Sequence, residues 1–133
     1  MADIQPLIDA ALFVRERAYV PYSRFKVGAA LRTHEGDVFA GCNVENAAYP
    51  QGSCAEAGAI AAMVAGGRAR IAEIVVAGAG HLPVTPCGGC RQRLREFAGP
   101  EVAVHMVNER GEIVLTRTLG QLLPDSFGPD HLG

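Results

Sequence analysis

Two short cysteine-containing segments are the part of the sequence best suited to chemistry. The first is Cys54-Ala55-Glu56 and the second is Pro86-Cys87-Gly88-Gly89-Cys90. If the second segment opens a helix, Cys87 and Cys90 lie three positions apart and share one face, so both thiolates can point at one ion. A thiolate from Cys54 would complete three protein ligands. Three ligands are typical of catalytic zinc sites, which keep a fourth position for water, whereas closed structural sites usually take four.

Glu56 is the residue that could carry out proton transfer beside such an ion. It lies two residues beyond Cys54, which places its carboxylate near a water on the metal but poorly for binding the ion itself. Such a carboxylate can take a proton from the water and later deliver it to a leaving group. Two other interpretations are a closed structural site with Cys42 as fourth ligand and a redox C-x-x-C pair. Cys42 has no partner at short spacing, and a redox pair leaves Cys54 and Glu56 unexplained.

Helices and strands on either side of these segments must bring them together. Apolar periodicity, capping residues and the placement of glycine and proline predict helices at residues 3–18, 54–65 and 87–98. Strands are predicted at residues 25–33, 38–42, 71–77, 101–107 and 112–116. The segment 71–77 is almost continuously apolar, which is typical of a strand covered on both faces. This order predicts a layered α/β domain around a mixed sheet of about five strands, with an antiparallel first pair and the middle helices as crossovers.

Composition indicates a single soluble domain spanning residues 1–133, with 49% hydrophobic and 20% charged residues. A net charge of −2 argues against the basic surface that nucleic acid or anionic lipid requires, so we expect neither partner. No signal peptide is predicted at residues 1–4, and the most apolar window, 74–80, is about a third of a membrane span. We therefore expect a cytoplasmic protein with a small-molecule target, whose four cysteines are thiols or metal ligands.

The C-x-E segment followed by P-C-x-x-C resembles the signature of the zinc-dependent nucleoside and nucleobase deaminases. Three further segments, at residues 21–25, 43–49 and 123–128, are similar to the short, tetrameric type of the cytidine deaminase family. The similarity runs from about Ala18 to Gly128 and covers nearly the whole chain. The Asn-x-Glu segment and the phenylalanine in the tail narrow the resemblance to deaminases of free nucleosides. It implies a three-layer α-β-α cytidine deaminase-like fold, with a mixed five-stranded sheet and crossover helices.

The resemblance also implies an activity, a cofactor and an assembly. The activity is hydrolytic deamination of cytidine and 2′-deoxycytidine to uridine and 2′-deoxyuridine, with release of ammonia. One Zn²⁺ per subunit would be held by Cys54, Cys87 and Cys90. Glu56 would move protons while hydroxide adds to the pyrimidine C4 and ammonia departs. The chain would form a homo-oligomer, a tetramer with active sites shared between subunits.

Substrate-binding residues follow from the same resemblance. Asn43 and Glu45 would hydrogen-bond the ribose 3′-hydroxyl, Phe25 would pack beside the ring and sugar, and the main-chain N–H of Ala55 would bind the pyrimidine O2. Neighbouring subunits would complete the pocket with Ala47, Tyr49 and Phe127. Taken singly, these residues also have structural explanations, because loop asparagines and glutamates commonly bind backbone groups and phenylalanines commonly pack in cores.

One position departs from the pattern of the enzymes that the chain resembles. Three thiolates on a divalent ion leave a net negative charge, which raises the pKa of a water on the metal. Many short cytidine deaminases place an arginine directly after C-A-E, where it can hydrogen-bond a zinc thiolate, but this chain has Ala57. We predict that Arg91, beside Cys90, and the N-termini of the two helices supply the compensating positive charge.

Three other functions stay open from the sequence. A deaminase of the same fold could act on another aminated pyrimidine such as blasticidin S, although the Asn-x-Glu pair favours a ribose. A deaminase of cytosine within RNA or DNA is disfavoured by the net charge of −2. A non-catalytic, zinc-stabilised assembly module would need neither the Glu56 carboxylate nor an exchangeable water on the metal.

Overall fold

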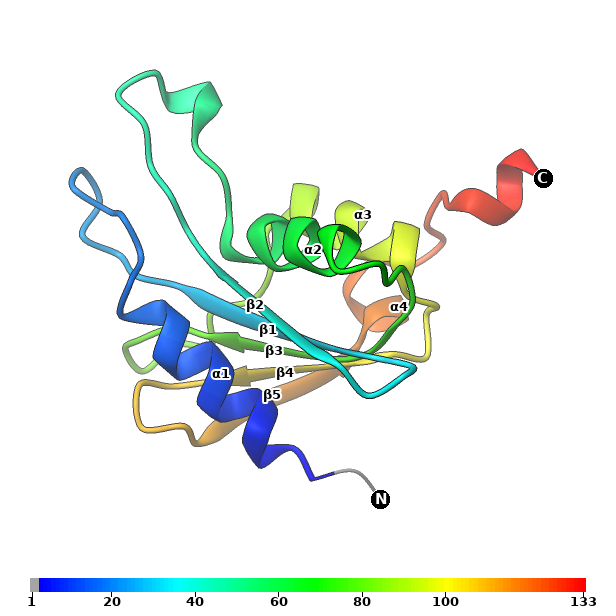
Figure 1. Ribbon diagram of the computed structural model, residues 1–133, viewed down its shortest axis with the longest axis horizontal. Coiled ribbons are helices and arrows are strands. Elements are labelled where there is room, and N and C mark those ends of the chain that lie inside the picture. The colour runs from blue at the N-terminus through cyan, green and yellow to red at the C-terminus, as the bar shows by residue number, and fades with distance from the viewer. Residues whose placement is uncertain (1–2) are drawn as a thin grey trace.

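The computed structural model describes residues 3–133, which fold into a sheet with helices on both faces (Figure 1). The helices are α1 (Gln5–Arg15), α2 (Ala55–Ala65), α3 (Gly88–Phe97) and α4 (Leu119–Leu122). The strands are β1 (Gly28–Thr33), β2 (Val38–Cys42), β3 (Ile71–Ala77), β4 (Ala103–Val107) and β5 (Ile113–Thr118). Short 3-10 turns occupy Tyr49–Gln51 and Pro129–Leu132. Within residues 3–133, no helix combines the length and apolar composition that crossing a bilayer requires.

The five strands form one mixed sheet in the order β2-β1-β3-β4-β5. β3 and β4 are parallel, and the chain crosses between them through α3, whereas the other neighbouring pairs are antiparallel. α1 packs on one face of the sheet, and α2 and α3 cover the other (Figure 1). The three-layer α-β-α fold with a mixed five-stranded sheet and crossover helices is therefore confirmed.

The strand directions explain why two segments distant in sequence meet. β2 and β3 are both antiparallel to β1, which lies between them, so β2 and β3 run in the same direction. The chain leaves the carboxyl ends of β2 and β3 at one edge of the sheet and then enters α2 and α3. Cys54 and Cys87, at the starts of these two helices, are thus brought to the same edge. In open α/β sheets this is the edge where ligands bind.

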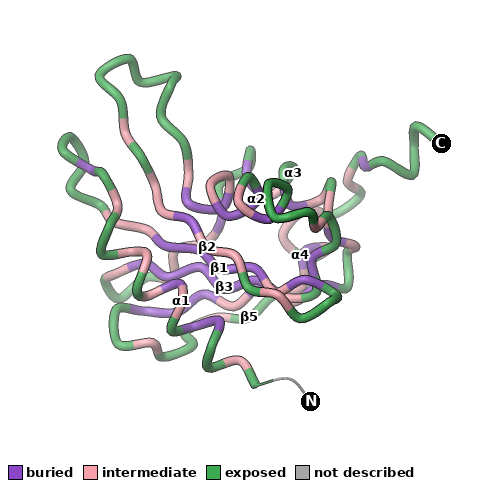
Figure 2. The backbone as a smooth tube through the Cα atoms, viewed as in Figure 1, coloured by how far each residue is buried: buried purple, intermediate pink, exposed green. Residues whose placement is uncertain are grey.

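Each face of the sheet buries its own apolar core (Figure 2). The larger core, beneath α2 and α3, includes Leu31, Met63, Ile74, Leu94 and Met106. The core beneath α1 includes Leu7, Ile8, Ala11, Val75 and Val107. β3 contributes alternate side chains to both cores, which confirms the expectation that its apolar sequence reflects burial on both faces.

Close packing of α2 on β2 depends on a glycine. A Cβ built on Gly41 of β2 would lie 2.3 Å from the amide nitrogen of Ala59 in α2, far inside van der Waals contact. Gly58 faces Gly41 from the helix, and a Cβ there would meet the Gly41 Cα at an ordinary 3.5 Å. Because Gly41 carries no side chain, the N-terminal half of α2 lies directly on β2. This contact fixes the position of Cys54 relative to the sheet.

The first helix and the first strand are shorter than the sequence predicts. α1 runs from Gln5, after the N-cap residue Ile4, to Arg15, and Asp3 accepts a hydrogen bond from the Gln5 amide at 3.0 Å from just outside the helix. β1 begins at Gly28 because the preceding residues pair with a side chain. The Val27 amide donates to Asn43 Oδ1 at 2.9 Å, and Asn43 Nδ2 donates to the Phe25 carbonyl at 2.8 Å. The side-chain amide of Asn43 thus makes hydrogen bonds with residues 25–27 that a neighbouring strand would otherwise make.

The last strands also differ from their predicted bounds. β4 begins at Ala103 rather than at residue 101, and β5 continues to Thr118 rather than ending at residue 116. Thr118 then begins α4 with a capping box, in which Gln121 and Thr118 exchange hydrogen bonds. The Thr-x-x-Gln spacing is a sequence signal for such a helix start, but α4 is not among the predicted helices.

Candidate functional site

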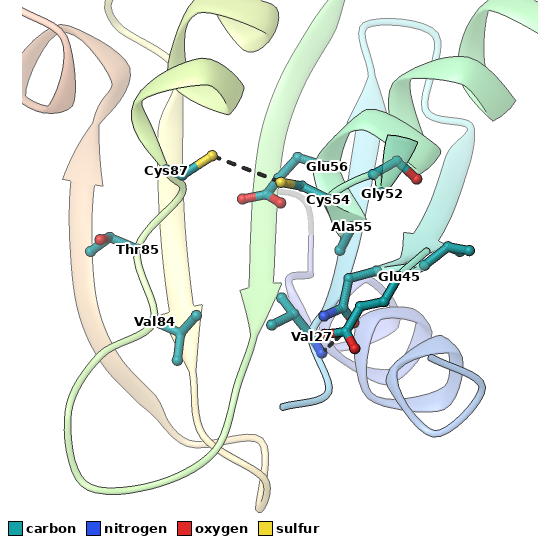
Figure 3. Close-up of a pocket in the computed structure, with 12 residues that line it drawn as sticks. Val27, Glu45, Gly52, Cys54, Ala55, Glu56, Val84, Thr85 and Cys87 are labelled. Atoms are coloured by element: carbon teal, nitrogen blue, oxygen red, sulfur yellow. Dashed lines mark hydrogen bonds between the residues drawn. The ribbon is translucent and has the colours of Figure 1, made fainter. Parts of the chain in front are cut away.

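Three thiols converge where α2 and α3 begin. Cys54 is the N-cap residue of α2, Cys87 is the N-cap residue of α3, and Cys90 lies in the first turn of α3. Their sulfur atoms all lie within 4.8 Å of one another, and the sulfurs of Cys54 and Cys87 are 3.8 Å apart (Figure 3). A tetrahedral zinc ion with Zn–S bonds of about 2.3 Å holds its sulfurs roughly 3.8 Å apart. The donor set therefore fits zinc in both chemistry and spacing.

The fourth cysteine is not part of this group. Cys42 ends β2 as a free, half-buried thiol, and the metal-ligating cluster consists of the other three cysteines. The interpretation with Cys42 as a fourth ligand is therefore not supported by the geometry. A three-thiol site leaves one coordination position for a small molecule, as catalytic zinc sites do.

The surroundings of the three thiols shift their pKa values in different directions. Burial raises the pKa of Cys90, whose side chain is completely enclosed, and burial also raises the pKa of Cys54. At Cys87, a hydrogen bond from the main-chain N–H of Cys90 lowers the pKa. Metal binding requires thiolates, so positive charge around this group promotes it. The N-termini of α2 and α3 each provide about half a positive charge.

Glu56 lies in the first turn of α2, directly beside the thiols. Its side chain is only 4% exposed, and its carboxylate points to the same space as the Cys54 sulfur (Figure 3). Burial raises the pKa of Glu56 above its usual value, because a charged carboxylate loses its hydration there. A raised pKa brings a carboxyl group closer to neutral pH, where it can both accept and donate a proton.

A pocket of about 310 Å³ opens in front of the thiols and Glu56. Val27 and Val84 form apolar walls from opposite sides (Figure 3). Asn43 and Glu45, which directly follow β2, are polar lining residues. Apolar walls with a few polar groups are typical of pockets for small ligands. Other lining residues are Val44, Gly52, Ser53, Cys54, Ala55, Glu56, Thr85 and Cys87. Sequence reasoning missed Val27, Val84 and Thr85, since nothing in their local pattern distinguishes Val27 from an ordinary strand residue or the other two from ordinary loop residues.

Asn43 and Glu45 line the pocket while also binding the backbone of residues 22–27. Glu45 Oε1 accepts the amides of Tyr22 and Ser23 at 3.0 and 3.1 Å, and Glu45 Oε2 accepts the Ser23 hydroxyl. The Ser23 hydroxyl chiefly lowers the pKa of Glu45. Asn43 keeps one amide hydrogen beyond its bonds to Phe25 and Val27. The structural explanation for this pair therefore holds, and it is compatible with a ribose-binding role that stays a prediction.

The remaining candidate residues lie at different distances from the pocket. Ala55 lines it and is buried, whereas Phe25 is 46% exposed and lines an adjacent hollow that shares Val84 and Thr85. Ala47 and Tyr49 lie on the β2–α2 loop that projects from the body of the molecule (Figure 1), and Tyr49 is 77% exposed. Phe127 lies on the tail, where it stacks on His131, and does not line the pocket of its own chain.

Two arginines of α3 lie near the thiols and make different contacts. Arg91 donates to the carbonyls of Pro86 and Leu122 at 2.7 and 2.8 Å and to Thr85 Oγ1 at 3.3 Å. The Arg91 guanidinium thus holds the loop before Cys87 rather than a thiol, and the prediction that its charge offsets the thiolates stays a prediction. Arg93, which sequence reasoning missed, reaches the Cys90 sulfur at 3.7 Å. The i, i+3 spacing of Cys90 and Arg93 on a helix was the available signal.

Comparisons with known proteins agree with this geometry. Residues 1–106 match the family model described as the cytidine and deoxycytidylate deaminase zinc-binding region. A cytidine deaminase of Halalkalibacterium halodurans is 43% identical over 98% of this chain and 98% of its own, and one of Sporosarcina psychrophila is 41% identical over 98% and 95%. The crystal structure of cytidine deaminase from Burkholderia pseudomallei superposes with a TM-score of 0.88 at 46% identity, covering 95% of this chain and 100% of that one. The chain therefore belongs to the cytidine and deoxycytidylate deaminase family, whose zinc-binding region supplies the three thiols described above.

Proposed function

We propose that this chain hydrolyses cytidine and 2′-deoxycytidine to uridine and 2′-deoxyuridine. In this reaction water adds at C4 of the pyrimidine, the bond from C4 to the amino group breaks, and ammonia leaves. The observation that carries the proposal is the buried Glu56 carboxyl beside three convergent thiols at the base of a nucleoside-sized pocket. Relatives that match the chain over nearly its whole length are cytidine deaminases, which supports the same activity.

In this proposal, some residues of the chain would hold the cofactor and another would transfer protons. Cys54, Cys87 and Cys90 would hold one Zn²⁺ per subunit, which supplies Lewis-acid activation of water when bound. Glu56 would take a proton from the attacking water and hold it at its carboxylate. It would then deliver that proton to the departing amino group, so that ammonia rather than an amide anion leaves. Burial of Glu56 favours both steps because it raises the pKa of the carboxyl.

Substrate orientation would come from groups that already face the pocket. As the first residue of α2, Ala55 has a main-chain N–H without an intrahelical acceptor, and this donor would bind the pyrimidine O2. Asn43 and Glu45 would bind the ribose 3′-hydroxyl, a buried polar pairing that rejects ligands without the hydroxyl. Phe25 would cover the ring and the sugar from the adjacent hollow.

The proposal includes a homo-oligomer with shared active sites, in the form of a tetramer. Large aromatic side chains are exposed on the single chain, among them Tyr49 on the projecting loop and Phe127 on the tail. Tyr49 packs edge-on against Tyr22 with ring centroids 6.2 Å apart, and Phe127 is 56% exposed. Exposed apolar side chains of this kind are typical of interfaces. In the assembly, Ala47, Tyr49 and Phe127 would complete the pockets of neighbouring subunits.

A cytoplasmic location is proposed on the basis of the thiols. All four cysteines are free, and the proposed zinc ligands must remain reduced to bind the ion. Reducing compartments maintain thiols in this state.

The test is a direct assay of the zinc-loaded protein on cytidine and on deoxycytidine. We expect the cytosine absorbance to fall while equimolar ammonia appears. A Glu56→Gln variant should lose activity by about 10²–10⁴-fold, the usual contribution of a positioned acid–base group. The variant must retain its zinc, so that the loss reports on proton transfer rather than on the metal. Full zinc content without turnover of either nucleoside would overturn the assigned substrates.

A further inference from the structure

With the Glu56 carboxylate beside it, the three-thiol site carries more negative charge than a divalent ion and the two helix N-termini balance, because the helix ends together offset only about one charge. Three thiolates exceed the charge of a divalent ion, and the Glu56 carboxyl lies beside them. Excess negative charge around a zinc ion weakens its Lewis acidity. Ala57, directly after Glu56, contributes no charge, and the Arg91 guanidinium is bonded to the Pro86 and Leu122 carbonyls.

Arg93 is the cation whose contacts fit this requirement. Its Nη1 atom lies 3.7 Å from the sulfur of Cys90, within hydrogen-bond range for a sulfur acceptor. Cys90 is fully buried, so water does not solvate its sulfur from outside.

Two small neighbouring residues, Gly89 and Ala57, leave space for the Arg93 guanidinium. A Cβ on Gly89 would lie 3.2 Å from Arg93 Nη1, so the side chain passes over a backbone position that carries no side chain. Ala57 of α2 and Arg93 of α3 line the same surface hollow. A methyl group at residue 57 leaves this hollow open, and the arginine enters it from the other helix.

We propose that Arg93 is a positioning residue that offsets the thiolate charge of the zinc site through Cys90. The guanidinium donates to the Cys90 sulfur from the hollow that Ala57 leaves open, and thereby favours retention of the ion. Arginine suits this position because its charge does not titrate and its planar group presents several donors. The inference rests on the proposed zinc site, but it does not depend on which substrate is deaminated.

Zinc retention by zinc-loaded protein in excess chelator tests the proposal directly. Arg93→Met keeps the length of the side chain and removes its charge, and we expect its zinc affinity to fall by about 10–100-fold, as for other groups that support metal ligands. Arg93→Lys should recover part of the loss. The matched control is Arg117→Met on β5, which removes the same charge from an exposed side chain that donates to the Thr116 carbonyl. Wild-type zinc retention by Arg93→Met would overturn the proposal.

A second-site variant separates charge from packing. Since residues 57 and 93 line one hollow, Ala57→Arg in the Arg93→Met background returns a guanidinium to the same space. We expect this double variant to recover zinc retention, and recovery would support the proposal. Continued loss of zinc in a folded double variant would assign the defect to packing of α3 and overturn it.

A spectroscopic readout is independent of turnover. With Co²⁺ in place of zinc, Arg93→Met should shift the thiolate-to-metal charge-transfer band, whereas Arg117→Met should leave it unchanged. A band that does not shift in Arg93→Met would also overturn the proposal. Both metal measurements remain decisive even if the wild-type protein fails to turn over cytidine, which would count against the proposed function alone.

Discussion

At the scale of single residues, two polar side chains serve the backbone and the pocket together. Asn43 closes the gap between β1 and the start of the β2–α2 loop, and Glu45 binds two amides and a hydroxyl of the preceding turn. Residues bound in this way have little rotational freedom left. Such preorganisation lowers the entropic cost of binding a sugar hydroxyl at this edge of the pocket.

The Glu45 interaction predicts a defined dependence of stability on pH. The Ser23 hydroxyl and the amides hold the pKa of Glu45 below the ordinary value of 4.5 in the folded chain. A lowered folded pKa contributes stability that is fully present above the unfolded value and is lost as pH falls through the folded value. We expect the stability difference between wild type and Glu45→Gln, measured by urea unfolding, to be constant from neutral pH down to about pH 5 and to shrink on further acidification.

Ser23→Ala provides the matched comparison, because it removes the group that lowers the pKa most while keeping the carboxylate. Its stability should depend less on pH below 4.5 than that of wild type. Equal acid sensitivity of wild type and Ser23→Ala would show that the hydroxyl does not hold the carboxylate.

At the scale of elements, the site depends on how closely α2 approaches β2. Gly41→Ala places a methyl group 2.3 Å from the Ala59 amide, so the helix must move. We expect a loss of about 1–3 kcal/mol in the free energy of unfolding, as for other overpacked cores, together with lower zinc content because Cys54 moves away from Cys87. Thermal or urea unfolding and metal analysis measure the two effects.

Gly58→Ala is the control at the same contact. There the new methyl group meets Gly41 at 3.5 Å, and alanine stabilises a helix interior by roughly 0.5–1 kcal/mol relative to glycine. This variant should therefore be as stable as wild type or more stable, with full zinc content. If both substitutions lowered stability equally, the contact would be less specific than the geometry indicates.

The elements also show what the sequence could and could not predict. The apolar run of β3 and the glycines after α2 determine their elements locally, and both were predicted correctly. The start of β1 was not, because residues 25–27 pair with the side chain of Asn43, a contact between distant residues. In the site, cysteine spacing predicted the thiol group. Adjacency in sequence pointed to Arg91, but the turn of a helix decides which side chain faces Cys90, and that side chain is Arg93.

At the scale of the whole molecule, two aromatic side chains that the proposed assembly would use, Tyr49 and Phe127, do not line the pocket of their own chain. Both are largely exposed. They lie on the β2–α2 loop and the C-terminal tail, which extend from the body of the molecule (Figure 1) and are mostly exposed along their length (Figure 2). Sequence patterns within one chain do not reveal whether these side chains enter the pocket of their own chain or of a neighbouring copy. The arrangement of the copies depends on shape complementarity over whole surfaces.

Mixed oligomers provide a test of shared sites. We expect Glu56→Gln chains and Phe127→Ala chains each to be weakly active alone, because one lacks the proton carrier and the other lacks the covering ring. Co-expressed, they should regain activity above both parents. In the mixed assembly, a pocket with an intact Glu56 can receive Phe127 from its neighbour. Activity no higher than the average of the two parents would show that Phe127 serves its own chain or none.

The closeness of Cys54 and Cys87, at the N-termini of α2 and α3, also has a consequence for the stability of the chain. Cys54 and Cys87 are 33 residues apart, and the segment between them contains all of α2 and β3. An ion bound to both sulfurs closes this segment into a loop, as a disulfide would. Closing a loop of that length restricts the unfolded chain by about 3–4 kcal/mol in the chain-entropy model. The thiols that equip the pocket for catalysis would thus also act as a removable cross-link, so that loss of the metal lowers both activity and resistance to unfolding.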